Sequence, residues 1–135
     1  MEKWFTRLLS TDELKAFIDN AKIGNKNEKA FIGLVMPDAA ERIQAVCGQG
    51  VQKIMLESEA VRHSYRVAYH NLQDDDLLLF TDVLNTATDI KLSDTKHQNN
   101  TVIQMRKNIG GKIIFTVEVR IKHGGWLALV TCARK

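Results

Sequence analysis

The sequence predicts an α+β fold, with N-terminal helices packed on a C-terminal antiparallel β-sheet. Up to about residue 85, apolar residues recur every three or four positions, which is the period of an amphipathic helix, with two short apolar runs in between. From residue 101 onward they alternate with polar residues, which is the period of a strand with one buried face. Helices followed by strands favour α+β over a repeated βαβ pattern.

Length and composition fit a single compact domain. The chain has 135 residues, of which 44% are hydrophobic and 26% are charged, as in ordinary globular proteins. No apolar run approaches the roughly 18–20 residues that span a bilayer, and the first residues lack the apolar core of a signal peptide. Cys47 and Cys132 form no metal-ligand spacing, so we expect two reduced thiols. We therefore expect a cytoplasmic protein with no membrane partner.

Capping residues and breakers divide the first two thirds of the chain. They predict helices over about 10–24, 38–48, 58–70 and 74–84, and short buried strands over 30–36 and 51–56. The last of these helices opens with the acidic residues Asp74, Asp75 and Asp76. Because acids favour the positive end of a helix dipole, we interpret this triplet as a cap rather than a metal site.

The last third predicts a three-stranded meander over 101–106, 112–121 and 125–133, with 88–93 as a candidate fourth strand. Glycines at 110–111 and 124–125 suit the two hairpin turns. Alternation assigns one side to the core: Ile103, Met105, Ile113, Phe115, Val117, Val119 and Ile121. It assigns the other side to Gln104, Arg106, Thr116, Glu118 and Arg120. On the last strand Leu127, Leu129 and Thr131 share one side, and both sides look largely apolar.

Charge is distributed unevenly along the chain. Residues 101–135 carry seven Lys or Arg and the single acid Glu118, a net charge of +6, whereas residues 1–100 carry a net charge of −3. Concentrated positive charge on one element is typical of a protein that binds a polyanion, most often nucleic acid. Lysines that protect a sheet edge from aggregation produce the same pattern, so charge alone leaves both interpretations open.

The predicted helix over 58–70 carries the most distinctive local chemistry. At 100° per residue, His63, Arg66 and His70 fall in one narrow stripe on an exposed face. Such a stripe is a candidate anion site, and histidine transfers protons readily near neutral pH. With a rise of about 1.5 Å per residue, the two histidines lie roughly 10 Å apart along the axis. Histidines on helix surfaces are usually inert, so spacing alone also fits a solvated face.

The order of these motifs resembles the phage-associated branch of the barnase–EndoU–colicin–RelE (BECR fold) nuclease superfamily. In that branch a stretch like Phe31-Ile32-Gly33 precedes the first helix, and a helix with two histidines seven residues apart follows, here at 63–70. An acidic segment then leads to a stretch like Phe80–Ile90, and the closing strand resembles Leu129-Val130-Thr131. The resemblance covers residues 30–135 as a BECR-like nuclease domain.

The remaining residues, 1–29, are expected to form an N-terminal helical extension within the single compact domain.

Two positions depart from the family pattern. Ser64 stands where the first histidine is commonly followed by an apolar residue, and Asn71 stands where the second is often followed by glycine.

The resemblance implies a small, metal-independent endoribonuclease of phage or prophage toxin type, which cleaves RNA through the ribose 2′-OH. This reaction needs a base, an acid and positive charge around the phosphorus. The resemblance implies that His63 and His70 transfer protons and that Thr131 donates a hydrogen bond to a phosphate oxygen. The substrate-binding residues would be Arg66 at the phosphate and Arg106, Arg120 and Lys122 along the sheet.

The implied partners are RNA, including tRNA or another structured RNA, and an immunity or antitoxin protein; no metal and no cofactor are expected. Two other classes stay open. One is a non-catalytic module that binds nucleic acid or protein on the same fold. The other is an unrelated small α+β protein, such as a structural or host-interaction factor of a mobile element.

Overall fold

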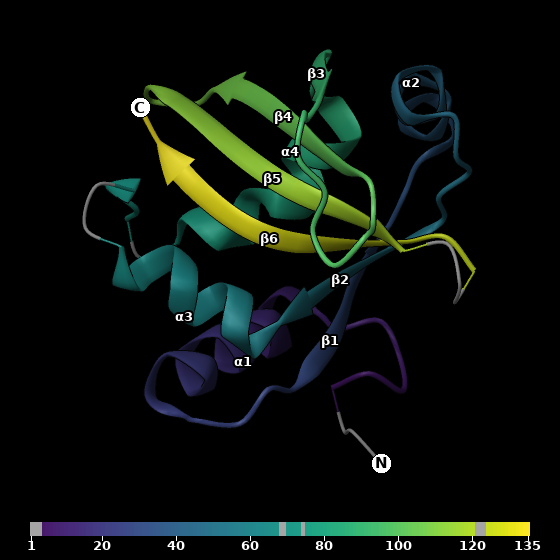
Figure 1. Ribbon diagram of the computed structural model, residues 1–135. Helices are drawn as coiled ribbons and strands as arrows, with labels where there is room; N and C mark the ends of the chain where they lie inside the picture. The colour runs from purple at the N-terminus through teal and green to yellow at the C-terminus, as the bar shows by residue number, and fades with distance from the viewer. Residues whose placement is uncertain (1–3, 68–69, 74, 121–123) are drawn as a thin grey trace.

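A single sheet runs through the molecule. The computed structural model describes residues 4–67, 70–73, 75–120 and 124–135, and in these residues six strands are ordered β1-β2-β6-β5-β4-β3. Figure 1 shows α1 and α3 together below β6, and α2 on the side of β3. The elements are α1 (Thr11–Ile23), β1 (Lys29–Leu34), α2 (Pro37–Cys47), β2 (Lys53–Glu57), α3 (Ser58–Arg66), the 3₁₀ helix η2 (Asp76–Leu79), α4 (Phe80–Thr86), β3 (Asp89–Leu92), β4 (Val102–Asn108), β5 (Lys112–Arg120) and β6 (Trp126–Arg134).

The structure confirms the α+β class and corrects the extent of the sheet. The predicted meander is present as β4, β5 and β6, and the candidate fourth strand is β3, antiparallel to β4. The two short strands of the first half, β1 and β2, belong to the same sheet, because β2 pairs in parallel with the start of β6. The sheet is therefore mixed. Alternation in a sequence indicates a strand but does not indicate which strand lies beside it.

Local signals explain the ends of the first two helices. Ser10 caps α1, since its hydroxyl accepts a hydrogen bond from the Glu13 N–H and the Glu13 carboxylate accepts one from the Ser10 N–H. Pro37 opens α2, where a missing N–H leaves no helix bond unmade. Gly48 ends α2 with φ of 74°, a left-handed conformation that glycine adopts without steric cost.

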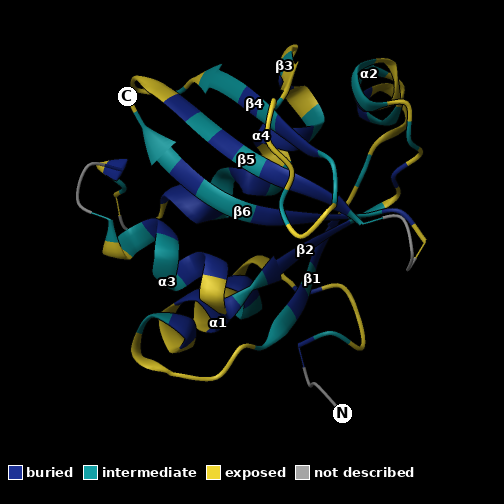
Figure 2. Ribbon diagram, in the orientation of Figure 1, coloured by how far each residue is buried: buried dark blue, intermediate teal, exposed yellow. Residues whose placement is uncertain are grey.

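The core lies between the helices and one face of the sheet. In Figure 2 the strands β2, β5 and β6 are buried or intermediate over nearly all of their length, whereas the connection between α1 and β1 is exposed. Phe80 of α4 stacks on Phe115 of β5 with ring centroids 5.1 Å apart. Phe17 of α1 belongs to the same core cluster, and Phe31 exchanges backbone hydrogen bonds with Trp4 and Leu9. The segment before β1 thus shares the core and covers the outer edge of that strand.

The face assignment predicted for β4 and β5 is confirmed. The predicted core residues are at most 1% exposed: Ile103, Met105, Ile113, Phe115, Val117 and Val119. Ile121 lies outside the described residues. Glu118 points to the opposite face, as predicted, yet it is only 1% exposed because His97 and Asn100 cover its carboxylate. A polar face of a strand is therefore buried locally by a loop that lies over it.

The side-chain directions predicted for β6 are wrong beyond Leu129. A β-bulge at Val130 makes Val117 pair with Leu129 but Thr116 pair with Thr131. The extra residue shifts the alternation by one position, so Thr131 lies on the polar face and Cys132 lies opposite Phe115 in the core. Because both faces of this strand carry apolar residues, the sequence does not reveal the shift.

Both cysteines are free thiols, as expected. Cys132 is fully buried, and this burial raises the pKa of its thiol above the ordinary value. Cys47 is half-buried at the end of α2, and its thiol lies 3.8 Å from the carbonyl oxygen of Gln49.

A close approach between Gly33 of β1 and Thr81 of α4 gives the first testable prediction. A Cβ at position 33 would lie 2.6 Å from both Cγ2 and Oγ1 of Thr81. We expect Gly33→Ala to lower the free energy of unfolding by about 1–3 kcal/mol through overpacking, as measured by urea denaturation.

The matched control for this prediction removes the two atoms that would clash. Gly33→Ala introduced into a Thr81→Ala background should cost much less than it costs in the wild-type background. An equal loss in both backgrounds would show that the contact is not the cause.

Candidate active site

α3 owes its position to the way β2 leaves the sheet. β2 pairs with β6 only over Lys53–Met55 and Trp126–Ala128, and the chain then passes directly from Glu57 into α3. Among the described residues, the next part of β6 has no strand beside it on that edge, and Ser64 of α3 lies there instead. Its buried hydroxyl accepts a hydrogen bond of 3.1 Å from the Cys132 N–H. A backbone donor of β6 is thereby satisfied by a helix side chain, which fixes α3 against the sheet.

The helix that was predicted to run to His70 ends at Arg66. Val67 is extended, with φ of −84° and ψ of 109°. His70 is only 6% exposed, and its Nδ1 lies 3.0 Å from the carbonyl oxygen of Ser64, a group that can only accept a hydrogen bond. The His63 and His70 ring centroids are 5.7 Å apart in an edge-to-face arrangement. The predicted arrangement, with both histidines on one exposed face and roughly 10 Å apart along the axis, is therefore wrong, because the helix ends before the second histidine.

A groove of about 1080 Å³ lies where α3 and β6 diverge. Three of the predicted site residues, His63, Arg66 and Arg120, line it. A second histidine, His97, comes from the β3–β4 connection, and the carboxylate of Glu118 comes from β5. The other lining residues are Gly24, Asn25, Asn27, Lys29, Glu57, Glu59, Ala60, Arg62, Gln98, Leu129 and Val130.

A buried network of charges forms one wall of this groove. Glu118 accepts hydrogen bonds from the Nε of Arg120 at 2.6 Å and from the side-chain amide of Asn100 at 3.0 Å. Its other oxygen contacts Nδ1 of His97. Arg120 also forms an ion pair with Glu57. Burial alone would lower the pKa of Arg120, but hydrogen bonds and charge from Glu118 and Glu57 raise it, so the guanidinium stays charged.

His97 is held in place by a tight turn. Gln98 and Asn99 have φ of 50° and 67°, and the flanking residues His97 and Asn100 exchange two backbone hydrogen bonds, of 2.9 and 3.1 Å. This geometry brings the His97 and Asn100 side chains to the same carboxylate of Glu118. The His97 side chain remains 44% exposed, so one side of the ring faces solvent while Nδ1 is engaged.

His63 has an environment that disfavours its charged form. Partial burial lowers its pKa below the ordinary value, and the nearby His70 and Arg66 lower it further. At neutral pH the imidazole is therefore neutral, and its unprotonated nitrogen can accept a proton. A histidine with a depressed pKa in a polar groove is a candidate general base.

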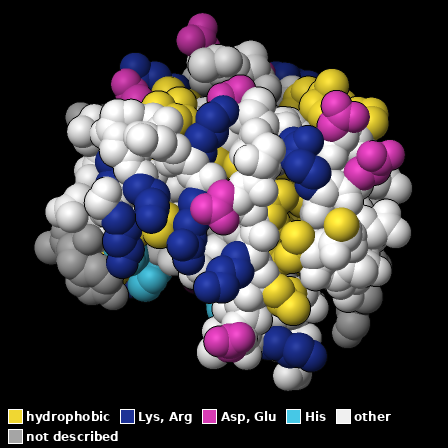
Figure 3. All heavy atoms as spheres, turned by 90° about the horizontal axis from the view of Figure 1, so that it is seen from above, with side chains coloured by type: hydrophobic (Ala, Val, Ile, Leu, Met, Phe, Trp, Pro, Cys, Tyr) yellow, Lys and Arg dark blue, Asp and Glu magenta, His cyan; other side chains and the backbone are white. Residues whose placement is uncertain are grey.

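The groove contains both signs of charge. Arg62 is committed to structure, since it donates hydrogen bonds to the carbonyls of Ala21 and Lys26. Arg120 is shared between two carboxylates. Arg66 is exposed and has no hydrogen-bond or ion-pair partner among the described residues, so its guanidinium is available to an anion. Figure 3 shows that Lys and Arg side chains gather on one half of the face seen from above, with few acidic side chains among them.

The other predicted site residues lie elsewhere. Thr131 is on the polar face next to the groove residue Val130, and its buried hydroxyl oxygen has no hydrogen-bond partner among the described residues. Arg106 lines a separate pocket at the β3–β4 end of the sheet. Lys122 falls outside the described residues. The structure thus gathers His63, Arg66 and Arg120, leaves His70 buried against His63, and does not place Arg106 with them.

Sequence reasoning missed His97, Glu57 and Glu118 as groove residues. A partial signal existed for Glu118, which is the single acid of the last third and alternates with core residues. No comparable signal marks His97 or Glu57, because their neighbours come from distant parts of the chain.

In the part of the chain that the structure describes, no group of three or more His, Cys, Asp or Glu side chains is arranged to hold a metal ion. Within the same residues, no helix combines the length and apolar character needed to cross a bilayer. Asp76, from the acidic triplet, accepts a hydrogen bond from the Gln73 N–H at 2.8 Å and pairs with Arg134 at 2.9 Å. The predicted helix cap is not seen in the described residues: Asp75, at the N-cap of η2, makes no side-chain capping bond, and Asp76 holds the preceding turn and pairs with Arg134.

Comparisons of the chain with protein-family models, with curated proteins and with solved structures found no match.

The contact between Ser64 and Cys132 predicts a measurable loss of stability. Ser64→Ala leaves the buried Cys132 N–H without a partner, which should lower the free energy of unfolding by about 1–3 kcal/mol. Ser93→Ala, which removes only exposed hydrogen bonds, serves as the control and should change stability by no more than about 0.5 kcal/mol. Chemical denaturation measures both, and a Ser64→Ala variant as stable as wild type would contradict this account of how α3 is held.

Proposed function

We propose that the chain is a metal-independent endoribonuclease of toxin type that cleaves RNA in the groove between α3 and β6. The observation that supports this proposal is the convergence of His63 and His97 on one groove that also contains Arg66 and Arg120. Two imidazoles from separate elements, in one groove with cationic groups, match the base, the acid and the positive charge that cleavage through the 2′-OH requires.

In the proposed reaction His63 acts as the general base. Its neutral imidazole takes the proton from the 2′-OH, and the 2′-oxygen forms a bond to phosphorus. The bond from phosphorus to the 5′-oxygen breaks, and His97 gives a proton to that leaving oxygen. The products are a 2′,3′-cyclic phosphate and a 5′-hydroxyl. Water stays out of this step because the ribose itself supplies the nucleophile, so DNA is not a substrate.

The cationic groups differ in role. Arg66 has a free guanidinium and stabilises the negative charge that develops on the phosphate oxygens. Arg120 is fixed by Glu57 and Glu118, and its third nitrogen lies 3.5 Å from Sδ of Met55, so we assign it to the order of the groove wall and not to direct phosphate contact. Glu118 also binds Nδ1 of His97, which leaves Nε2 as the nitrogen that faces the groove. We assign to Glu118 the positioning of both residues.

His70 is assigned a positioning role rather than proton transfer. It does not line the groove, and it lies against His63 while its Nδ1 is bound to Ser64. Thr131 is given no role in this reaction, because it does not line the groove and its hydroxyl oxygen is buried.

The direct test of the proposal is cleavage of a mixed-sequence oligoribonucleotide in EDTA. We expect 2′,3′-cyclic phosphate ends, and no cleavage of DNA of the same sequence. Loss of a general base or acid costs on the order of 10²–10⁴ in rate, so His63→Ala and His97→Ala should each fall in that range.

His70→Asn is the matched control, because asparagine keeps a donor for the Ser64 carbonyl. It should retain activity within about tenfold of wild type. If wild-type protein leaves every RNA intact at all concentrations tested, the proposal fails. RNA that binds with salt-dependent affinity but is not cut would favour the non-catalytic binding module.

The depressed pKa of His63 gives a pH prediction. A general base works when deprotonated, so kcat/KM should rise with pH and reach half its plateau below pH 6.5, the ordinary pKa of histidine. Removing the His70 ring in His70→Asn should move this half-point upward, because a neighbour that disfavours the His63 cation is lost. If kcat/KM instead falls as the pH rises through this range, His63 acts as the acid.

A further inference from the structure

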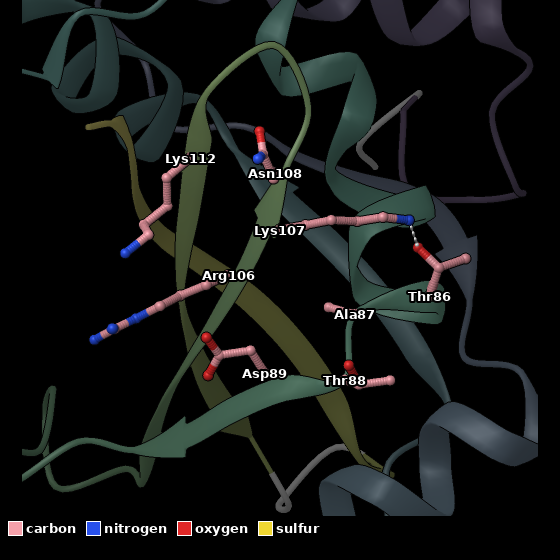
Figure 4. Close-up of a pocket in the computed structure, with 8 residues that line it drawn as sticks. All are labelled: Thr86, Ala87, Thr88, Asp89, Arg106, Lys107, Asn108 and Lys112. Carbon is pink, nitrogen blue, oxygen red and sulfur yellow. Dashed lines mark hydrogen bonds between the residues drawn. The ribbon is translucent and has the colours of Figure 1, made fainter.

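A second pocket, of about 380 Å³, lies at the opposite end of the sheet from the groove. β3 begins at Asp89, opposite Arg106 of β4, and the chain before it comes from the end of α4. Residues 86–88 therefore diverge from the last residues of β4 and leave a gap between them. Figure 4 shows this gap, with Lys107 reaching across it toward Thr86.

The lining of this pocket is rich in hydrogen-bond donors. It contains the cationic side chains of Arg106, Lys107 and Lys112, and the single acid among its lining residues is Asp89. The Arg106 and Lys112 side chains extend in the same direction from neighbouring strands (Figure 4). Nε of Arg106 is buried and has no hydrogen-bond partner among the described residues. A buried donor without a partner costs about 1–3 kcal/mol, a cost that a bound anion would remove.

Lys107 already donates a hydrogen bond to Thr86 across the pocket, but the other contacts that hold the walls leave Arg106 and Lys112 unused. Arg42 of α2 donates hydrogen bonds to the carbonyls of Asn85 at 2.7 Å and Ala87 at 3.2 Å, which fixes the segment entering β3. The Asn108 side chain accepts a bond of 3.1 Å from the Gly111 N–H, which fixes the β4–β5 turn. The cationic side chains are therefore presented by a preorganised frame.

We propose that this pocket binds a backbone phosphate of the same RNA strand whose cleaved phosphate lies in the groove, an inference that rests on the proposed function. Arg120 and Lys112 lie at the two ends of β5, eight residues or about 27 Å apart at about 3.4 Å per residue. The polar sheet face between them carries Gln104 and Thr116 and is half-buried. An RNA must therefore extend over several nucleotides to occupy both places.

Lysines that only protect a sheet edge from aggregation would place the same positive charge around the pocket without forming a phosphate site. Lys91 separates the two interpretations, because it is exposed and pairs with Gln104 on the same polar face but does not line the pocket. Lys91→Gln and Lys112→Gln remove equal charge from the same face. A purely general attraction of charge would make their effects alike.

The experiment compares RNA of three and twelve nucleotides. In a His63→Ala background, Arg106→Gln and Lys112→Gln should each weaken binding of the 12-mer by about three- to tenfold and lower its salt slope by about one unit. Lys91→Gln should change both much less. With His63 intact, cleavage of the 3-mer should be unchanged by all three substitutions, since the short RNA reaches only the groove.

Equal effects of Lys91→Gln and Lys112→Gln, no loss for the 12-mer, or no binding of the 12-mer would each overturn the second phosphate site. Loss of 3-mer cleavage at matched melting temperature would also overturn it, by showing that these residues act on the groove. Failure of the proposed function is read separately, from whether the wild-type protein cuts the 3-mer and 12-mer at all.

Discussion

The structure depends on the replacement of a strand by a helix beside β6. β2 pairs with only the first residues of β6, and Ser64 of α3 then takes the Cys132 N–H that a neighbouring strand would otherwise bind. Because this contact is buried, α3 has one position, and His63 and Arg66 on its outer side face the gap that the departing strand leaves. The groove forms because β2 leaves β6 after three residues. Ligand sites in other proteins also often lie where neighbouring strands of a sheet separate.

A second constraint, the buried carboxylate of Glu118, connects three parts of the groove. It binds Arg120 on its own strand and Asn100 and His97 on the loop that covers the sheet. A buried charge must be paired to be tolerated, so the fold and the groove share one network. Removing Glu118 would release the loop and Arg120 together. Substitution of Glu118 would therefore change stability and function together. Arg66 is exposed and has no partner in the described chain, so its substitution tests function without a large change in stability.

Sequence reasoning succeeded where a signal is local and repeated. The α1 cap at Ser10 and the buried side of β5 follow from spacing alone, and so does the closeness of His63 to Arg66. It failed where the outcome depends on contacts that spacing does not reveal. The helix ends at Arg66 although its pattern continues, and His70 turns back to the Ser64 carbonyl. The bulge at Val130 reverses Thr131, and the parallel pairing of β2 with β6 has no signature in either strand.

The central claim is that His63 and His97 face one phosphate, and an NMR titration of their imidazole resonances with a nucleoside 3′-monophosphate tests it most directly. This ligand carries the phosphate and ribose of a cleavage product but offers no bond to cut, so the result does not depend on turnover. The account predicts that the His63 and His97 signals shift together with one dissociation constant, and that Arg66→Gln raises this dissociation constant. Signals of both histidines that stay unchanged at saturating ligand would contradict it.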